Sequence, residues 1–297
     1  MKKQQDISPY LVYLYYNHMA LKKICALTMA RNDEFFLRRW VSYYGKELGM
    51  ENLYVFLDGK DQPLPDWCPG VHVTACEKIQ GKVVDLDRRR LEFLSDQAGI
   101  LFSEYDMVIG TDADEFLIAD PRLGVGLAEY LSASGCSSSL SGLGIDVGQN
   151  MSCEGAIDSS EPFLNQRRYA LIGTRYTKPS VIARPLRWGS GFHRIKGHDF
   201  HIAKGLYLFH FGYLDMKRIE ERFNDKDRIA GGWSRHLAKR ARTIRLVSRK
   251  KARDWDKWTS AARILQTFIR PPYAWNKPAM LNMEIVVKIP DRFKNIV

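Results

Sequence analysis

The sequence predicts an α/β fold: a mostly parallel sheet with flanking helices, followed by a basic helical tail. Strand and helix patterns alternate through the first half of the chain, which implies a parallel sheet covered on both faces. From about residue 215 onward the pattern is mostly helical and basic. The 297 residues are 45% hydrophobic and 27% charged, which excludes wholesale disorder.

The first two elements are a buried strand over residues 22–29 and an amphipathic helix after it. Asn32 or Asp33 can cap this helix, and Gly49 can end it because glycine accepts the left-handed conformation. The apolar face of the helix has helical spacing and consists of Leu37, Trp40, Val41, Tyr44 and Leu48.

Further strands follow at residues 53–57, 71–75 and 105–110, with a helix at 84–102 before the last of them. The crossovers between these parallel strands should be right-handed. Beyond residue 135 the alternation loosens, and strand-like runs appear at 140–147, 168–173, 180–184 and 206–211.

The chain is expected to form one domain, residues 19–225, preceded by an extension (1–18) and followed by a basic helical extension (226–297) packed on the same domain. No window approaches the ~18 apolar residues of a transmembrane helix, and the first residues do not have the pattern of a signal peptide. The five cysteines are odd in number and never spaced CxxC, which argues against a disulfide framework and a cysteine zinc site. A reducing cytoplasm is the expected compartment.

The net charge of +11 is unevenly distributed. Residues 204–297 hold 22 basic and nine acidic residues, whereas residues 1–203 hold 23 basic and 25 acidic ones. A basic third can serve a nucleic acid, an anionic membrane surface or an anionic substrate, or it can be a solvated helical face.

Polar side chains follow three of the predicted strands, at residues 30–34, 58–61 and 111–116. Ligands of open parallel sheets bind at this edge. Strand alternation would place Asp112 and Asp114 on the same side, ~6.6 Å apart. Two such carboxylates repel unless they are protonated or bridged by a cation, and Mg²⁺ or Mn²⁺ suits them. His210 could complete the metal shell; as an isolated residue it could equally be a hydrogen-bonded core histidine.

The order of these motifs resembles the glycosyltransferase family 2-like proteins, which have the GT-A fold and a DxD motif. The matching segments are Met29–Glu34, the helix ending at Leu48-Gly49, Asp58, and Asp112–Phe116. Lys178-Pro179, His193 and His210 resemble the distal half of that family. The resemblance covers roughly residues 20–225.

The resemblance implies a hexosyltransferase-like enzyme with a nucleotide-diphospho-sugar donor and Mn²⁺ or Mg²⁺. It makes Asp114 the main metal carboxylate, places Asp112 near the metal or the ribose, and makes His210 the distal histidine. It also places Arg31, Asn32 and Asp58 in the nucleoside pocket. Two positions depart from the family: Asp33 stands where the motif often has Glu, and the polar stretch 59–61 is short.

Glycosyl transfer must stabilise negative charge on the leaving diphosphate, which a divalent cation does. An inverting enzyme also needs a carboxylate base, for which Asp146 is the first candidate and Glu154 the second. His193 either lines the acceptor side or has no role. The acceptor is expected to be a glycan or a lipid-linked molecule, in polysaccharide, lipopolysaccharide or other glycoconjugate synthesis.

A second apolar stripe at helical spacing consists of Trp255, Trp258, Ala262, Leu265 and Ile269, with basic residues interspersed. It is expected to pack on the enzyme's own core; the alternative is peripheral docking at the inner face of an anionic membrane. Two rival functions are an aspartyl phosphatase-like hydrolase, with Asp112 as nucleophile, and a basic nucleic-acid-binding protein. The acidic residues at the strand ends argue against a nucleic acid partner.

Overall fold

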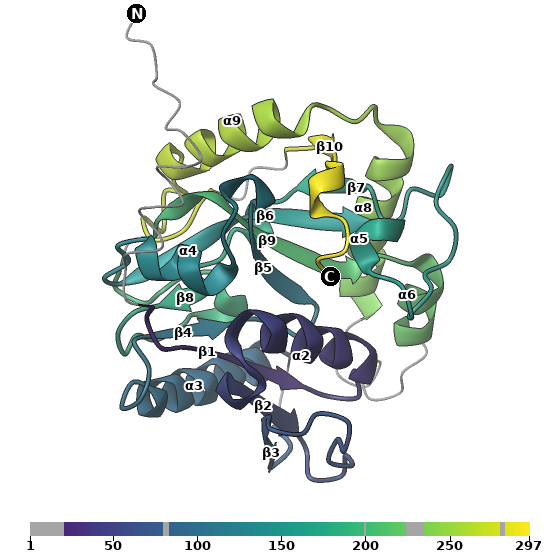
Figure 1. Ribbon diagram of the computed structural model, residues 1–297. Helices are drawn as coiled ribbons and strands as arrows, with labels where there is room; N and C mark the ends of the chain where they lie inside the picture. Colours follow the sequence, from purple (N-terminus) through teal and green to yellow (C-terminus); the bar gives the residue numbers. More distant parts are fainter. Residues whose placement is uncertain (1–20, 80–82, 199, 224–233, 280–282) are drawn as a thin grey trace, which may run out of the picture.

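The computed structural model describes residues 21–79, 83–198, 200–223, 234–279 and 283–297 (Figure 1). Ten strands of this described part form one sheet. The strands are β1 (Ile24–Ala30), β2 (Leu53–Asp58), β3 (His72–Cys76), β4 (Met107–Gly110), β5 (Glu115–Ala119), β6 (Ser139–Gly148), β7 (Tyr169–Ile172), β8 (Val181–Ile182), β9 (Ile202–Tyr213) and β10 (Val286–Lys288). The α-helices are α2 (Glu34–Leu48), α3 (Val83–Leu101), α4 (Leu127–Ala133), α5 (Phe163–Gln166), α6 (Met216–Phe223), α8 (Ser234–Arg249) and α9 (Trp255–Phe268).

The first half of the sheet is parallel, in the order β3-β2-β1-β4. Strand β1 alternates between two cores: Ile24 and Ala26 pack with α2, whereas Cys25 and Leu27 pack with α3. This period of two lets α2 and α3 cover opposite faces of one strand. The expected α/β class is therefore confirmed.

The second half of the sheet is mixed, which the sequence did not indicate. Strand β6 runs parallel to β9 but antiparallel to β7 and β8. Strand β5 returns antiparallel along β9, and β10 pairs antiparallel with β7. The parallel character of the sheet thus belongs to its first four strands and to the β6–β9 pair.

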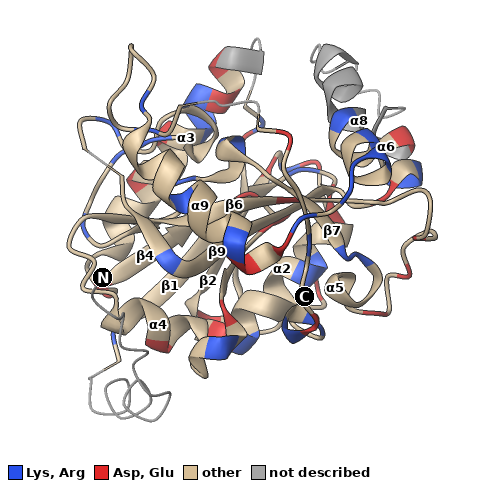
Figure 2. Cartoon of the chain, turned by 90° about the horizontal axis from the view of Figure 1, so that it is seen from above, with Lys and Arg blue, Asp and Glu red and all other residues tan. Residues whose placement is uncertain are grey.

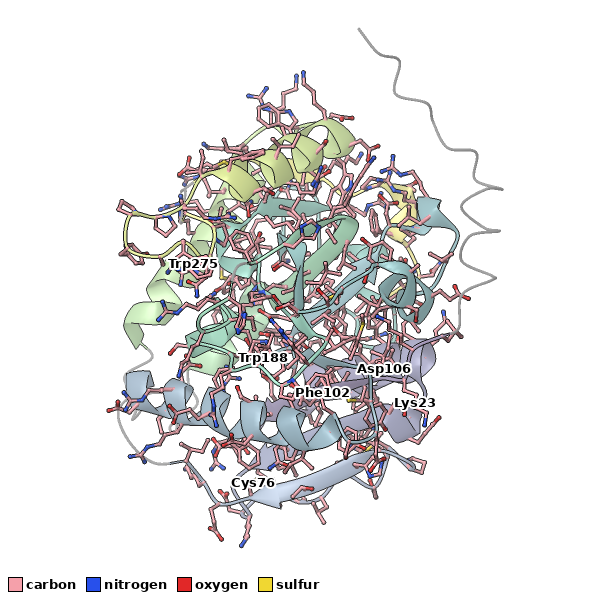
Figure 3. The ribbon with its side chains drawn as sticks, turned by 90° about the vertical axis from the view of Figure 1, so that its left-hand side faces the viewer. Lys23, Cys76, Phe102, Asp106, Trp188 and Trp275 are labelled. Carbon is pink, nitrogen blue, oxygen red and sulfur yellow. The ribbon has the colours of Figure 1, made fainter. Side chains whose placement is uncertain are left out.

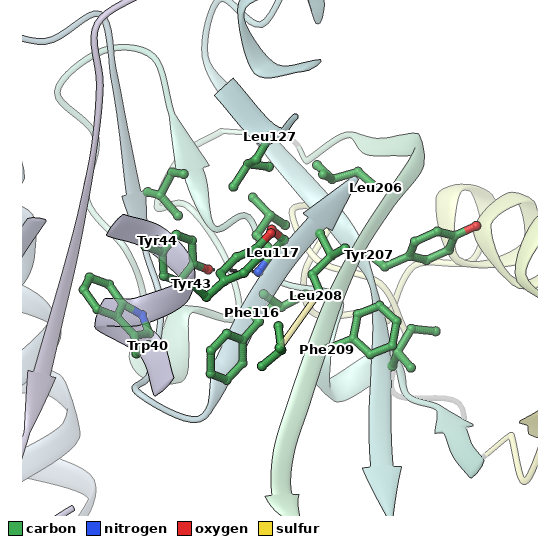
Figure 4. Packing of buried hydrophobic residues seen from close by; sticks show 14 of the residues in the cluster. Trp40, Tyr43, Tyr44, Phe116, Leu117, Leu127, Leu206, Tyr207, Leu208 and Phe209 are labelled. Atoms are coloured by element: carbon green, nitrogen blue, oxygen red, sulfur yellow. Dashed lines mark hydrogen bonds between the residues drawn. The ribbon is translucent and has the colours of Figure 1, made fainter. Parts of the chain in front are cut away.

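Helix α2 is held on the sheet by buried aromatic rings with polar ends (Figure 4). Trp40 Nε1 donates to Thr111 Oγ1 at 2.9 Å, and Tyr43 Oη donates to the Leu117 carbonyl at 2.7 Å. The helix begins after Asp33 and ends at Gly49, whose φ of 93° suits glycine. Both predicted ends are confirmed in position, although the Asp33 side chain makes no capping hydrogen bond. The hydrogen bond to Thr111 ties α2 to the segment that leaves β4.

The C-terminal region packs on the sheet through α8, α9 and β10. The expected domain boundaries at residues 18 and 225 lie outside the described residues. Trp255 and Ala262 belong to the main core, which confirms internal packing for that part of the second stripe. Leu265 and Ile269, the last members of the stripe, are exposed. Among the residues that the structure describes, no helix has the length and apolar character needed to cross a bilayer.

Candidate active site at the end of β4

The acidic motif lies in a turn between β4 and β5, and its two aspartates face different partners. Strand β4 ends at Gly110, so strand alternation no longer applies to Asp112 and Asp114. Asp112 contacts Arg90 and Lys178, whereas Asp114 Oδ2 lies 3.7 Å from His210 Nε2. The two carboxylates thus have different partners, and their expected placement on one side stays a prediction. The turn gives each of the two like charges a nitrogen-bearing partner.

Asp112 is held by two cationic side chains from distant segments. Its Oδ1 accepts from Arg90 Nη1 at 2.6 Å, and its Oδ2 accepts from Lys178 Nζ at 3.1 Å. Burial alone would raise the pKa of Asp112, but Arg90 and Lys178 outweigh it and hold this pKa well below its ordinary value. Both oxygens of Asp112 therefore accept from a cationic side chain, and its role as a metal ligand stays a prediction.

Glu115, the third carboxylate of the motif, is fully buried below the turn. Lys178 Nζ donates to its Oε1 at 2.5 Å. Burial raises the pKa of Glu115 to about 7, in spite of the attraction of Lys178. Lys178 therefore joins Asp112 and Glu115 and fixes the turn against the residues beside β8.

His210 is oriented by a carboxylate on the neighbouring strand. The parallel pairing of β6 and β9 places Asp146 opposite His210, and Asp146 Oδ1 lies 2.7 Å from His210 Nδ1. Tyr176 stacks on the imidazole, with ring centres 3.9 Å apart. A proton on Nδ1, donated to Asp146, leaves the Nε2 lone pair directed toward Asp114. This is the tautomer that a metal-binding histidine needs.

Asp146 fits a positioning role better than the predicted role of general base. Its side chain is 5% exposed, and its second oxygen accepts from Thr243 Oγ1 of α8 at 2.5 Å. Burial raises the pKa of Asp146, against the hydrogen bonds from His210 and Thr243. A base must reach the acceptor hydroxyl. Both oxygens of Asp146 are instead engaged by groups of the protein.

Glu154, the second candidate for the base, is likewise occupied. Its two oxygens accept from the backbone amides of Asn150 at 2.7 Å and Arg168 at 2.6 Å. Burial raises the pKa of Glu154, and these amide hydrogen bonds act against the shift. Glu154 therefore closes a loop after β6 through both of its oxygens.

The space between Asp114 and His210 suits one divalent cation. A separation of 3.7 Å lets a single ion approach both atoms at the ~2.1 Å typical of Mg²⁺. A Cβ atom on Gly212 would lie 2.7 Å from His210 Nε2 and 3.0 Å from Asp114 Oδ2, so glycine keeps this space open. Within the described ranges, no three His, Cys, Asp or Glu side chains form a complete metal site. Substrate oxygens and water would supply the other ligands, as is usual for Mg²⁺.

The ends of β1 and β2 bring the three predicted nucleoside residues together. Arg31 Nη1 donates to the Asp58 carbonyl at 2.6 Å, and the guanidinium also pairs with Asp61 at 2.8 Å. The Asn32 amide donates to Gln62 Oε1 at 2.8 Å. Because β2, β1 and β4 are neighbours in the parallel sheet, this group and the acidic turn lie along the same edge.

His193 lies close to Lys178, on the loop after β8. Burial, together with the charges of Lys178 and Arg175, lowers its pKa from 6.5 to about 3. The imidazole is therefore neutral at physiological pH. This places the residue predicted for the acceptor side next to the acidic turn.

Four contributors to the site were not predicted from the sequence: Arg90, Tyr176, Gly212 and Thr243. Gly212 carried a usable signal, because an isolated glycine in an aromatic strand often marks a close approach. Arg90 is one of three consecutive arginines in α3, and Thr243 is an ordinary helix residue; neither pattern distinguishes them.

No family model and no curated protein sequence matches the chain. Among the solved structures similar to it is one described as mannose-1-phosphate geranyltransferase from Thermus thermophilus. The two are 11% identical, with a TM-score of 0.30, and the match covers 73% of this chain. It spans 64% of that chain, less than two thirds of its length. A likeness of this degree carries no argument about activity.

Proposed function

We propose that the protein is a metal-dependent glycosyltransferase that moves a sugar from a nucleotide-diphospho-sugar to an acceptor hydroxyl. The observation that carries the proposal is the pair formed by Asp114 Oδ2 and His210 Nε2, 3.7 Å apart. This pair stands at the end of a parallel half-sheet, with open space at Gly212. The ordered motifs of the sequence support the same reaction class.

Asp114 and His210 would hold Mn²⁺ or Mg²⁺, which when bound would stabilise the charge of the leaving diphosphate. Asp146 and Thr243 keep the His210 ring in place for this task. Arg90 and Lys178 hold the acidic turn through Asp112, so that Asp114 stays directed toward His210.

Arg31, Asn32 and Asp58 are proposed to line the nucleoside pocket at the same edge of the sheet. The polar ends of β1 and β2 support this role, because a nucleoside presents hydroxyls and a base edge that need polar partners. The acceptor is proposed to be a glycan or a lipid-linked molecule.

The test combines metal binding with donor turnover. Titration with Mn²⁺, followed by electron paramagnetic resonance, should show one site whose affinity rises with the correct nucleotide-sugar among UDP-, GDP-, CMP- and dTDP-sugars. Asp114→Asn should lose at least about 100-fold in metal affinity and in sugar release, since changes outside the ligand shell already cost ~10–100-fold. Asp66→Asn, an exposed aspartate in the turn-rich segment after β2, is the matched control. Full metal affinity and turnover of Asp114→Asn at saturating donor would refute the proposal.

The rival hydrolase hypothesis requires Asp112 as a nucleophile with a free oxygen. Arg90 and Lys178 hold both of its oxygens, so the geometry does not favour this reaction. A nucleic-acid-binding function would instead give a salt-dependent shift of DNA mobility with no release of sugar.

A further inference from the structure

Exposed apolar side chains are concentrated at the end of α9 and in the loop after it. The described residues contain ten exposed large apolar side chains, and six of them lie between residues 264 and 275. We call these six the apolar patch: Ile264, Leu265, Phe268, Ile269, Tyr273 and Trp275. Phe268 is 78% exposed and Tyr273 is 73% exposed. Apolar side chains grouped in this way mark an interaction site more often than scattered ones do.

The most exposed helical residues of the apolar patch lie off the face by which α9 packs on the core. Trp255, Ala262 and Gln266 are buried, and Gln266 Oε1 accepts from Thr177 Oγ1 at 2.6 Å. Ile264 and Phe268, one helical turn apart, share a different and exposed face of the helix. Trp275 lies in the loop that continues from the end of the helix (Figure 3). The second stripe of the sequence is therefore internal at its start and exposed at its end.

The charge of this segment is entirely positive. Residues 257–279 contain Lys257, Arg263, Arg270 and Lys277 and no acidic residue. The Lys277 ammonium lies 4.8 Å from the centre of the Tyr273 ring, and the Arg270 guanidinium lies 4.0 Å from that of Phe200. Basic residues also appear on helices α6 and α8, which lie apart from α9 in this view (Figure 2).

We propose that the apolar patch and these four basic residues dock the protein on an anionic lipid bilayer. Exposed Trp, Tyr and Phe side chains enter the interface between headgroups and acyl chains, while Lys and Arg meet anionic headgroups. If a second copy of this chain covered the patch instead, the four basic residues of each copy would face those of the other, and their repulsion would oppose association. A nucleic acid would satisfy the charges but leave six apolar side chains without a partner.

The segment that carries the apolar patch is linked to loops beside the candidate active site by two hydrogen bonds. Gln266 of α9 bonds Thr177, the neighbour of Lys178. Asn276 Nδ2 donates to the Ile195 carbonyl at 2.7 Å, in the loop that carries His193. Docking would therefore bring the predicted acceptor side toward the bilayer. The consequence that the acceptor is lipid-linked rests on the proposed function.

The test is co-sedimentation of the full chain with vesicles, in EDTA and without nucleotide. Vesicles of mixed phosphatidylglycerol and phosphatidylcholine should bind the protein, high salt should release it, and pure phosphatidylcholine should bind it weakly. Phe268→Ser/Trp275→Ser should weaken partitioning about 100-fold, which is tenfold or ~1.4 kcal/mol for each side chain. The control Ile100→Ser/Met151→Ser removes two exposed apolar side chains elsewhere and should bind as the wild type does.

Three results would overturn the proposal. The first is a folded wild type that does not bind anionic vesicles, and the second is equal binding by the Phe268→Ser/Trp275→Ser variant. The third is a dimer in sedimentation velocity that this variant abolishes, which would assign the apolar patch to a second copy. Because the assay contains neither metal nor donor, its failure would leave the proposed glycosyl transfer untouched, and loss of Mn²⁺ binding would not affect vesicle binding.

Discussion

Replacing Gly212 by alanine should block the proposed metal position while leaving the fold intact. The added methyl group would lie 2.7 Å from His210 Nε2 and 3.0 Å from Asp114 Oδ2. These distances are shorter than carbon contacts allow, and the His210 ring cannot easily retreat because Tyr176 stacks on it and Asp146 bonds it. The methyl group therefore occupies the space that a cation ~2.1 Å from both atoms would need.

The expected magnitude is a loss of at least about 100-fold in Mn²⁺ affinity, the upper end of what changes outside the ligand shell cost. The free energy of unfolding should change by less than the metal affinity, since alanine is favoured over glycine in a strand by roughly 0.5–1 kcal/mol and offsets part of the crowding. We therefore expect metal affinity to fall by more than the free energy of unfolding does.

The measurement is Mn²⁺ titration by electron paramagnetic resonance, with urea denaturation of the metal-free protein beside it. Gly99→Ala is the matched control, because a Cβ at that helical position meets nothing within 4 Å. It should leave Mn²⁺ affinity unchanged and stabilise the helix by up to ~1 kcal/mol. Unchanged Mn²⁺ affinity in Gly212→Ala would show that no cation binds between Asp114 and His210.

Two further predictions concern groups around this pair. Thr243→Val removes the hydroxyl that donates to Asp146. It should lower the free energy of unfolding by about 1–3 kcal/mol and the Mn²⁺ affinity by about tenfold. Urea denaturation measures the first effect and Mn²⁺ titration the second, and an unchanged Mn²⁺ affinity would mean that Thr243 has only a structural role. His193→Gln should make the free energy of unfolding less dependent on pH below neutrality. The pKa of His193 is about 3 in the folded protein and 6.5 ordinarily, so the unfolded chain binds a proton first as the pH falls. Between these two pKa values the free energy of unfolding of the wild type should decrease by up to ~1.4 kcal/mol for each unit by which the pH falls. Urea denaturation of both proteins at several pH values should show the difference. An equal pH dependence in the two proteins would contradict a buried, neutral His193.

The parallel half of the fold was predictable because its signals are local. Strand β1 was expected at 22–29 and is found at Ile24–Ala30, since a run of apolar residues of strand length is bounded by polar ones. The helix after it was predictable from its apolar face at helical spacing and from the residues at its two ends, Asp33 and Gly49. The carboxyl ends of parallel strands share one edge of the sheet. The polar clusters after β1, β2 and β4 lie along that edge, as expected.

The roles within the site depended on contacts that local patterns do not contain. Asp146 and His210 are 64 residues apart, and only the pairing of β6 with β9 sets them opposite each other. Asp112 and Asp114 lie in the turn after β4, and their different partners Arg90, Lys178 and His210 come from distant segments. Strand β5 was missed because its first residue, Glu115, belongs to the acidic motif and reads as part of a turn.

The hydrogen bond from Thr243 to Asp146 has a consequence for the order in which the chain is made. Synthesis delivers Asp114, Asp146 and His210 well before helix α8, and the edge strand β10 comes later still. A nascent chain can therefore hold every proposed ligand and still lack the hydroxyl that fixes the orienting carboxylate. The arrangement proposed to bind the cation is therefore complete only after helix α8 has been made, so prematurely terminated products that end before Thr243 should bind Mn²⁺ more weakly than the full chain.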